Sequence, residues 1–244
     1  MKEELPSILV TDGWETDAND KLVEVVIPST VDTYQNPTKI TFFGDSINWI
    51  PTGAGVLQEF DASNMTTWTI GSLFSGFSAL TSFKADNLES IVFSGESFKN
   101  CSLLNTVSMK GLKSLTKTTY YSPFSGTPNI CNLLFDNLET IICQDGSGYA
   151  LFSAVTSLQV VNLPKFNLVK CIQNNNPAIF SGCTGLQSVT LGSEGHPVPA
   201  INSSNFFNGC TQSGLTITIY TTGGATLPGS PWGATNATIV YETA

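Results

Sequence analysis

A phenylalanine recurs six times at nearly constant spacing between residues 74 and 207. Each copy is followed by small or polar residues and then by an aliphatic residue. The copies read FSGFSAL (74–80), FKNCSLL (98–104), FSGTPNI (124–130), FSAVTSL (152–158), FSGCTGL (180–186) and FNGCTQSGL (207–215). Successive phenylalanines are 24, 26, 28, 28 and 27 residues apart. A repeat of this length predicts a stack of similar units that share one continuous core.

The repeat extends beyond the aliphatic residue, which we call position zero. Positions +3, +5, +8 and +11 are apolar in most copies, so the unit reads L-x-x-V-x-L-x-x-L-x-x-I. The V-x-L step alternates as a strand does, and no window keeps a helical period. The F-x-G-C segment suits a short 3₁₀ or single-turn connection. We predict a single elongated β-rich solenoid whose strands at 104–109, 131–135, 158–163 and 187–191 stack in parallel in one sheet.

The repeat resembles the BspA-type leucine-rich repeats of bacterial surface proteins. FSGCTGLQSVTL (180–191) carries the resemblance best, and LQEFDASNMTTW (57–68) is similar to the Asp-Ala-Ser-Asn repeats of related surface lipoproteins. These repeats are longer than the family's usual unit, with extra loop at 116–123, 144–151 and 172–179. The resemblance implies a secreted or surface-anchored, non-catalytic interaction protein with no active site to carry over.

The two ends of the chain differ from its middle. Residues 1–54 contain β-like runs but no clear phenylalanine frame, so we interpret them as an N-terminal cap with degenerate repeats; a separate small domain is the alternative. Residues 55–244 form the predicted leucine-rich-repeat solenoid. Its last strand is expected at 237–242, as a C-terminal capping strand, with Trp232 packed over the end of the core.

The charge balance limits the possible partners. The chain has ten basic residues, all lysine, against 19 acidic ones, for a net charge of −9, so we expect no nucleic-acid binding. No segment is long and apolar enough to be an integral membrane span. The start of the sequence lacks a positive segment followed by an apolar one, so either the protein is cytosolic or a secretion signal has been removed. Because the chain is poor in charge and rich in Ser, Thr, Asn and Gly, we expect an extracellular or outer-surface location with the signal segment removed. We also expect a monomer.

The six cysteines invite a disulfide interpretation, but their positions argue against it. Cys101, Cys183 and Cys210 each stand three residues after the repeated phenylalanine, while Cys143 and Cys171 share another repeat position. Equivalent residues stack one or more coils apart, so we predict buried free thiols that act as small apolar side chains. A disulfide or a metal site is the alternative.

Other chemistry-bearing residues lack the pattern that catalysis or cofactor binding needs. His196 has no second histidine and is expected in a surface loop. The cluster Asp12, Asp17, Asn19 and Asp20 lacks the spacing of a calcium loop. Glu89 and Glu139 occupy equivalent positions two units apart and are expected to be solvated rather than a glycosidase pair. We therefore assign no catalytic residue, no metal ligand and no cofactor.

Aromatic residues in the inserted loops are the ligand-contact candidates: Tyr120, Tyr121 and Tyr149. Exposed aromatic rings beside neutral polar side chains suit sugar rings or protein surfaces, although the tyrosines could also pack locally. We predict a non-catalytic surface or secreted module that recognises a host protein or a glycan. The alternatives are a structural spacer in a larger cell-surface assembly and, least favoured, a glycan-acting enzyme.

Overall fold

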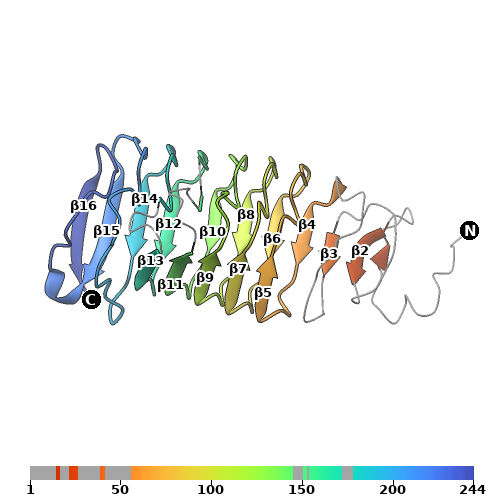
Figure 1. Ribbon diagram of the computed structural model, residues 1–244, viewed down its shortest axis with the longest axis horizontal. Coiled ribbons are helices and arrows are strands. Elements are labelled where there is room, and N and C mark those ends of the chain that lie inside the picture. The colour runs from red at the N-terminus through yellow and green to blue at the C-terminus, as the bar shows by residue number, and fades with distance from the viewer. Residues whose placement is uncertain are drawn as a thin grey trace, which may run out of the picture.

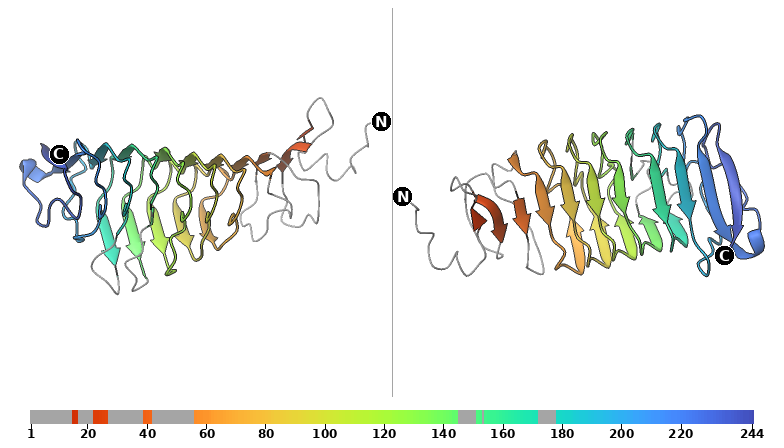
Figure 2. Two further views of the ribbon diagram at one scale, coloured as in Figure 1. Left: turned by 90° about the horizontal axis from the view of Figure 1, so that it is seen from above. Right: turned by 180° about the vertical axis from the view of Figure 1, so that it is seen from behind.

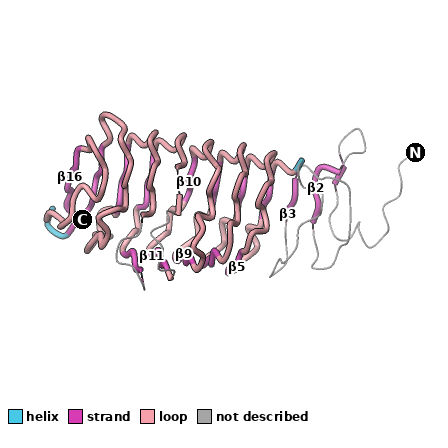
Figure 3. The backbone as a smooth tube through the Cα atoms, turned by 45° about the horizontal axis from the view of Figure 1, so that its top comes forward, coloured by secondary structure: helices cyan, strands magenta, loops and turns pink. Residues whose placement is uncertain are grey.

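The chain winds into an elongated β-solenoid whose coils follow one another in a nearly straight row (Figures 1 and 2). The computed structural model describes residues 15–16, 22–26, 39–41 and 56–244, except 145–150, 153 and 172–177. Within those residues there is no α-helix, and short strands alternate with turns and loops (Figure 3). The β-rich solenoid predicted from the repeat is therefore confirmed.

The five coils between residues 59 and 171 each contribute one strand to each of two faces, whereas the last three strands of the chain belong to the first face alone. The first face has a seven-stranded sheet in the order β1-β2-β3-β4-β6-β8-β10 and a four-stranded sheet in the order β12-β14-β15-β16. The strands are β1 (Glu15–Thr16), β2 (Leu22–Val26), β3 (Lys39–Thr41), β4 (Glu59–Asp61), β6 (Ser82–Lys84), β8 (Thr106–Ser108), β10 (Asn132–Leu134), β12 (Val160–Leu163), β14 (Ser188–Leu191), β15 (Thr216–Thr221) and β16 (Thr238–Thr243). Apart from the antiparallel β1–β2 pair, neighbouring strands run parallel.

The second face is a five-stranded parallel sheet in the order β13-β11-β9-β7-β5. Its strands are β5 (Thr67–Ile70), β7 (Ser90–Phe93), β9 (Ser114–Lys117), β11 (Thr140–Cys143) and β13 (Leu168–Cys171). Alternate residues of both faces point into the space between them, as the period of two requires. The buried residues at +3 and +5, such as Val107 and Met109, meet those at +8 and +11, such as Leu112 and Leu115, in one core.

The prediction of a single uninterrupted sheet on the first face is wrong. β8 pairs with β10 and β12 pairs with β14, but no ladder joins β10 to β12. The interruption coincides with Phe135, which places an aromatic ring at +5, where the adjacent coils have Met109 and Leu163. Its ring lies 6.1 Å from that of Phe152, and we attribute the separation of the strands to this added volume. The second face continues past this point through β11 and β13.

The corner edge of the solenoid consists of the six phenylalanine-containing segments, 74–80 through 207–215. The rings of Phe98, Phe124, Phe152, Phe180 and Phe207 are at most 1% exposed, which confirms the predicted ladder. Consecutive rings from Phe74 to Phe207 stack at centroid distances of 5.2, 5.0, 4.9, 5.4 and 5.9 Å. The stack runs through all six coils and ties their cores together.

The residue two positions after each ring explains the Phe-x-Gly pattern. All six of these residues have positive φ angles: Gly76 (82°), Asn100 (60°), Gly126 (72°), Ala154 (54°), Gly182 (71°) and Gly209 (76°). A left-handed backbone costs an L-residue free energy that glycine does not lose, so glycine is favoured there. The repeat therefore restricts two positions in each segment of the corner edge, the buried ring and the residue with a left-handed backbone.

The C-terminal end of the solenoid has a final parallel strand and a buried Trp232, two features that the sequence predicts. β16 pairs in parallel with β15 as the last strand. Trp232 is 1% exposed, and its carbonyl accepts a hydrogen bond from the Phe207 amide at 2.9 Å. The loop carrying Trp232 begins with the 3₁₀ turn η2 (Thr222–Gly224) and takes the place of a further coil over the corner edge.

Candidate functional site

The loop after β9 presents two tyrosines to solvent. Tyr120 and Tyr121 are 60% and 61% exposed, which makes them the most exposed large apolar side chains of the described residues. The loop is held on both sides of the tyrosines. The Thr118 amide donates to the Phe93 carbonyl at 2.9 Å, and the Ser122 hydroxyl donates to the Leu151 carbonyl at 3.0 Å. The loop is thus tied to the preceding coil and to the following one.

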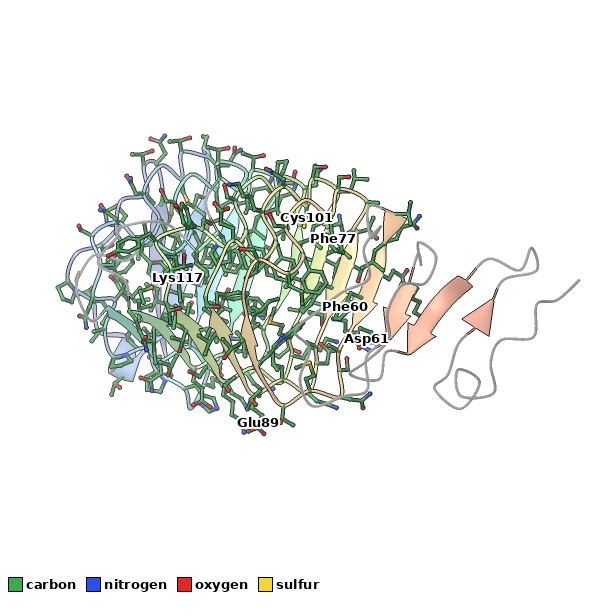
Figure 4. The ribbon with its side chains drawn as sticks, turned by 45° about the vertical axis from the view of Figure 1, so that its right-hand side comes forward. Phe60, Asp61, Phe77, Glu89, Cys101 and Lys117 are labelled. Atoms are coloured by element: carbon green, nitrogen blue, oxygen red, sulfur yellow. The ribbon has the colours of Figure 1, made fainter. Side chains whose placement is uncertain are left out.

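A buried lysine supports the same loop from inside. Lys117 ends β9 and is only 1% exposed, and Figure 4 shows it within the solenoid rather than at the rim. Its Nζ donates to the Thr119 carbonyl at 2.6 Å, immediately before the tyrosines. The neighbouring coils place Phe93 and Cys143 in the same register. A lysine in this apolar column has a structural use, since its hydrogen bond to Thr119 fixes the backbone of the exposed loop.

The three inserted loops leave neighbouring strands. The loops at 116–123, 144–151 and 172–179 follow β9, β11 and β13, which are consecutive parallel strands of the second face. Tyr149, the third tyrosine predicted from the sequence, lies outside the described residues. The structure therefore places Tyr120 and Tyr121 side by side on one loop. Sequence analysis missed the buried Lys117 support, although a lysine at a repeat position that is otherwise apolar is a signal that could have revealed it.

The outward side of the first face is polar and interlocked. Asn132 Nδ2 donates to Asn105 Oδ1 and to Thr106 Oγ1, both at 3.2 Å, and Thr106 donates to Asn105 Oδ1 at 2.9 Å. Ser108 points the same way but is 5% exposed, because its hydroxyl donates to Asp86 Oδ1 at 2.5 Å. Asn132 and Ser108 therefore each bond to the preceding coil through their side chains.

The turn edge of the solenoid comprises the turns that join the two strands of a coil (85–89, 109–113, 135–139 and 164–167) and the charged residues beside them. Lys84 Nζ lies 3.2 Å from Asp61 and 4.0 Å from Asp86, and Lys113 Nζ lies 3.1 Å from Glu89. Burial by itself raises the pKa of Asp61, but hydrogen bonds from Ser63 and Lys84 outweigh it and leave that pKa below its ordinary value of 3.8.

The two glutamates considered as a catalytic pair belong to this turn edge. The Lys113 amide donates to the Glu89 carbonyl and the Glu139 amide donates to the Lys113 carbonyl, so a lysine coil separates the glutamate coils. The side chains of Glu89 and Lys113 are 58% and 54% exposed. Figure 4 shows Glu89 at the rim of the molecule. The arrangement is a solvated ion pair, and it lacks the enclosed pair of acids that glycoside hydrolysis needs.

The repeat cysteines are core residues, as predicted. Cys101, Cys183 and Cys210 are fully buried and free of disulfides. Each thiol donates to the carbonyl of the repeated phenylalanine one coil earlier, at 3.0, 3.2 and 3.1 Å. Burial raises the pKa of Cys101 and Cys183 to about 12 and that of Cys210 to about 11. Such thiols stay protonated at neutral pH and are poor nucleophiles and metal ligands.

The remaining candidates offer no chemistry of their own. His196 is exposed in a turn closed by hydrogen bonds with Ser193, as expected for a surface histidine. The acidic cluster Asp12, Asp17, Asn19 and Asp20 lies outside the described residues. Among the residues that are described, no three His, Cys, Asp or Glu side chains are placed to hold a metal ion. The described residues also contain no helix with the length and apolar character that a membrane span requires.

Comparison with known proteins shows distant similarity to solved structures. No protein-family model matches the sequence, and no curated protein matches it. Two solved structures are similar. A leucine-rich repeat protein of T. pallidum (TpLRR) is 18% identical, with a TM-score of 0.44 over 88% of this chain and 81% of that one. A leucine-rich repeat protein of Bacteroides ovatus is 16% identical, with a TM-score of 0.23 over 89% and 74%. The assignment of a leucine-rich-repeat solenoid rests on the repeat and the parallel ladders themselves.

Proposed function

We propose that this chain is a non-catalytic recognition module, secreted or displayed on a bacterial surface, that binds a host protein or a glycan through the loop after β9. One observation carries the proposal: Tyr120 and Tyr121 are exposed on a loop that is held by hydrogen bonds on both sides. The resemblance of the repeat to BspA-type surface proteins and the charge-poor composition support the extracellular location.

A held loop with two tyrosines suits recognition for an energetic reason. Tyrosine offers a large contact area with few rotatable bonds, and aromatic anchors dominate many interfaces. The Lys117, Thr118 and Ser122 hydrogen bonds order the loop before any ligand arrives, so less entropy is lost on binding. Tyr149 belongs to the next inserted loop along the face, and we include it in the proposed contact surface.

The N-terminal residues 1–54 are proposed to cap the solenoid rather than to form a separate domain. β2 and β3 run parallel to β4 in the same ladder, which supports a continuous stack. A chain that begins at residue 55 would then expose the first regular coil. We expect it to lose solubility or to unfold at lower denaturant concentration than the full chain, whereas a separate domain could be removed without either effect.

Binding screens with matched variants test the recognition site. The wild-type chain is screened against glycan and host-protein arrays, and each hit is measured again with Tyr120→Ala/Tyr121→Ala and with Val160→Ala. Val160 is 55% exposed on the outward side of β12 and serves as the control. The proposal expects at least a tenfold loss of affinity in the tyrosine variant and little change in the control. Loss only in the Val160 variant, or no hit at all, would contradict it.

A further inference from the structure

β16 leaves one edge of the first face without a neighbouring strand among the described residues. It is six residues long and pairs with β15 along its whole length, from Thr216↔Thr238 to Thr221↔Thr243. It lies at the extreme end of the solenoid, at the opposite end from β1 (Figure 1). Natural proteins usually blunt such an edge with lysine, proline or a bulge. The sequence TIVYET contains neither lysine nor proline, and its register is regular.

The backbone groups on the open edge belong to alternate residues. The amides of Thr238 and Ala244 donate to the carbonyls of Leu215 and Thr221 in the neighbouring coil, at 2.8 and 3.0 Å. Alternate residues of a strand direct their N–H and C=O groups to the same side. The intervening residues Ile239, Tyr241 and Thr243 therefore direct theirs away from β15. Three donors and three acceptors stand in a row that only an extended backbone can match.

The side chains next to this edge leave the core incompletely covered. In β15 the inward residues Ile217 and Ile219 are fully buried. Their register partners in β16, Ile239 and Tyr241, pack against the same core but remain partly exposed, as do Ala237 and Leu227 beside them. The open strand edge and this apolar surface adjoin one another at the end of the molecule. A partner that pairs with the strand would also cover the apolar residues.

We propose that a second copy of this chain occupies the edge, with the two β16 strands paired antiparallel about a two-fold axis at Tyr241. In this register Tyr241 faces Tyr241 of the second copy, and Ile239 faces Thr243 in both directions. The outward backbone groups of all three residues are then satisfied by six hydrogen bonds. The two first faces become one continuous sheet, and the two apolar ends meet. A dimer replaces the monomer expected from the sequence.

The chemistry of the edge favours a second copy over an unrelated strand. A two-fold pair is self-complementary by construction, so it supplies both a strand of equal length and an apolar end of the same shape. The only charged side chain, Glu242, lies opposite Val240 in this register, and it does not face the other Glu242. Apart from Glu242, β15 and β16 contain no acidic or basic side chain except tyrosine. The two strands therefore offer no other charge by which an unrelated partner could be selected.

Sedimentation velocity over a concentration series tests the proposal with two substitutions at one position. Thr243→Pro removes an N–H that faces the open edge but leaves the bonds to β15 in place. Thr243→Ala keeps that N–H and removes only an exposed side chain. We expect reversible dimers of the wild-type chain and of Thr243→Ala. We expect dimerisation at least about tenfold weaker in Thr243→Pro, at an unchanged circular dichroism spectrum. A wild-type chain that stays monomeric at every concentration would overturn the proposal, as would equal dimerisation of all three proteins.

Amide exchange measured by NMR checks the pairing even if Thr243→Pro fails to fold. The amides of Ile239, Tyr241 and Thr243 should become protected only at concentrations where dimers form, while that of Val240 should be protected throughout. Concentration-independent exchange at Ile239 and Tyr241 in a dimeric sample would show that the contact lies elsewhere, and the edge proposal would fail. The tyrosine loop after β9 is not involved, so this result is independent of the recognition site.

Discussion

The corner edge and the turn edge both stack equivalent residues from coil to coil, but they do so with different chemistry. At the corner edge buried rings lie about 5 to 6 Å apart, and each buried repeat thiol reaches the previous coil's backbone. At the turn edge the contacts are ion pairs such as Lys113–Glu89, whose side chains are more than half exposed. Buried aromatic packing stabilises strongly, whereas exposed ion pairs contribute little. The comparison indicates that the corner edge holds the coils together.

The largest expected effect comes from the interior of the ring stack. Phe152→Ala should lower the free energy of unfolding by about 3–5 kcal/mol, because it leaves a cavity between Phe124 and Phe180. Phe207→Ala should cost less, because a loop rather than a full coil covers its far side. Urea unfolding of both variants measures the difference. An interior loss below about 1 kcal/mol, typical of surface sites, would contradict the account.

The buried thiols should make the corner edge sensitive to alkali. The pKa of Cys183 is raised from 9.0 to about 12, so its contribution is complete below pH 9 and is lost as the pH rises toward 12. Stability measured from pH 8 to pH 11 should fall, and it should fall less in Cys183→Ala. At pH 8 a thiol reagent should modify the partly exposed Cys131 first and reach Cys101, Cys183 and Cys210 only in denaturant. Rapid modification of these three in the folded protein would count against the buried column.

Lowering the pH should reduce the stability that the turn edge contributes. The pKa of Asp61 is lowered, so the stability from its bonds with Ser63 and Lys84 is present above pH 3.8 and is lost as the pH falls through the shifted value. The loss should be small, since this group is partly exposed, and Asp61→Asn should remove that part of the acid dependence. Urea midpoints between pH 6 and pH 2.5 provide the measurement, and an unchanged acid profile in the variant would contradict the assignment.

One substitution at the corner edge should stabilise the protein. Ala154 has a φ of 54° at a position where four of the other five coils have glycine, and its side chain is exposed. Ala154→Gly should therefore raise the free energy of unfolding by about 0.5–1 kcal/mol, because the left-handed strain outweighs the greater freedom of glycine in the unfolded chain. Destabilisation in a urea titration would show that this corner is not strained.

The smallest effect is expected at the turn edge. Lys113→Ala should change the free energy of unfolding by less than about 1 kcal/mol, and the change should shrink further in high salt. Lys113→Met, which keeps the length of the side chain without its charge, separates the ion pair from packing. A loss comparable to that of Phe152→Ala would reverse the ranking of the two edges.

This difference in energy explains what the sequence could and could not predict. Phe152, Gly182 and Cys183 belong to a pattern that repeats because few residues satisfy a buried ring, a left-handed backbone or a small apolar site. The ion pairs of the turn edge are harder to predict, since exposed pairs contribute little to stability. The equivalent positions of Glu89 and Glu139 do not by themselves reveal that Lys113 pairs with Glu89. The interruption beside Phe135 was also missed, because the period marks that position as apolar but does not report its volume.

The candidate site also has one part that could be predicted from the sequence and one part that could not. Tyr120 and Tyr121 could be named from the sequence because they fall in a loop that departs from the repeat. Their support could not, because it depends on Lys117 turning inward at the end of β9 and on Ser122 reaching the next coil. Lys117 leaves one local signal, a lysine at a repeat position that is otherwise apolar, but the carbonyl groups that Lys117 and Ser122 reach are set by the three-dimensional stack.

Native-state hydrogen exchange tests most directly whether the corner edge holds the coils together. The amides of Gly182 and Gly111 make matched bonds to a neighbouring coil, at 2.8 Å in both cases, one at the corner edge and one at the turn edge. The account predicts that Gly182 exchanges only through global unfolding, with a free energy equal to that from urea titration, and that Gly111 exchanges through smaller local openings. Equal protection at the two amides, or slower exchange at Gly111, would contradict it.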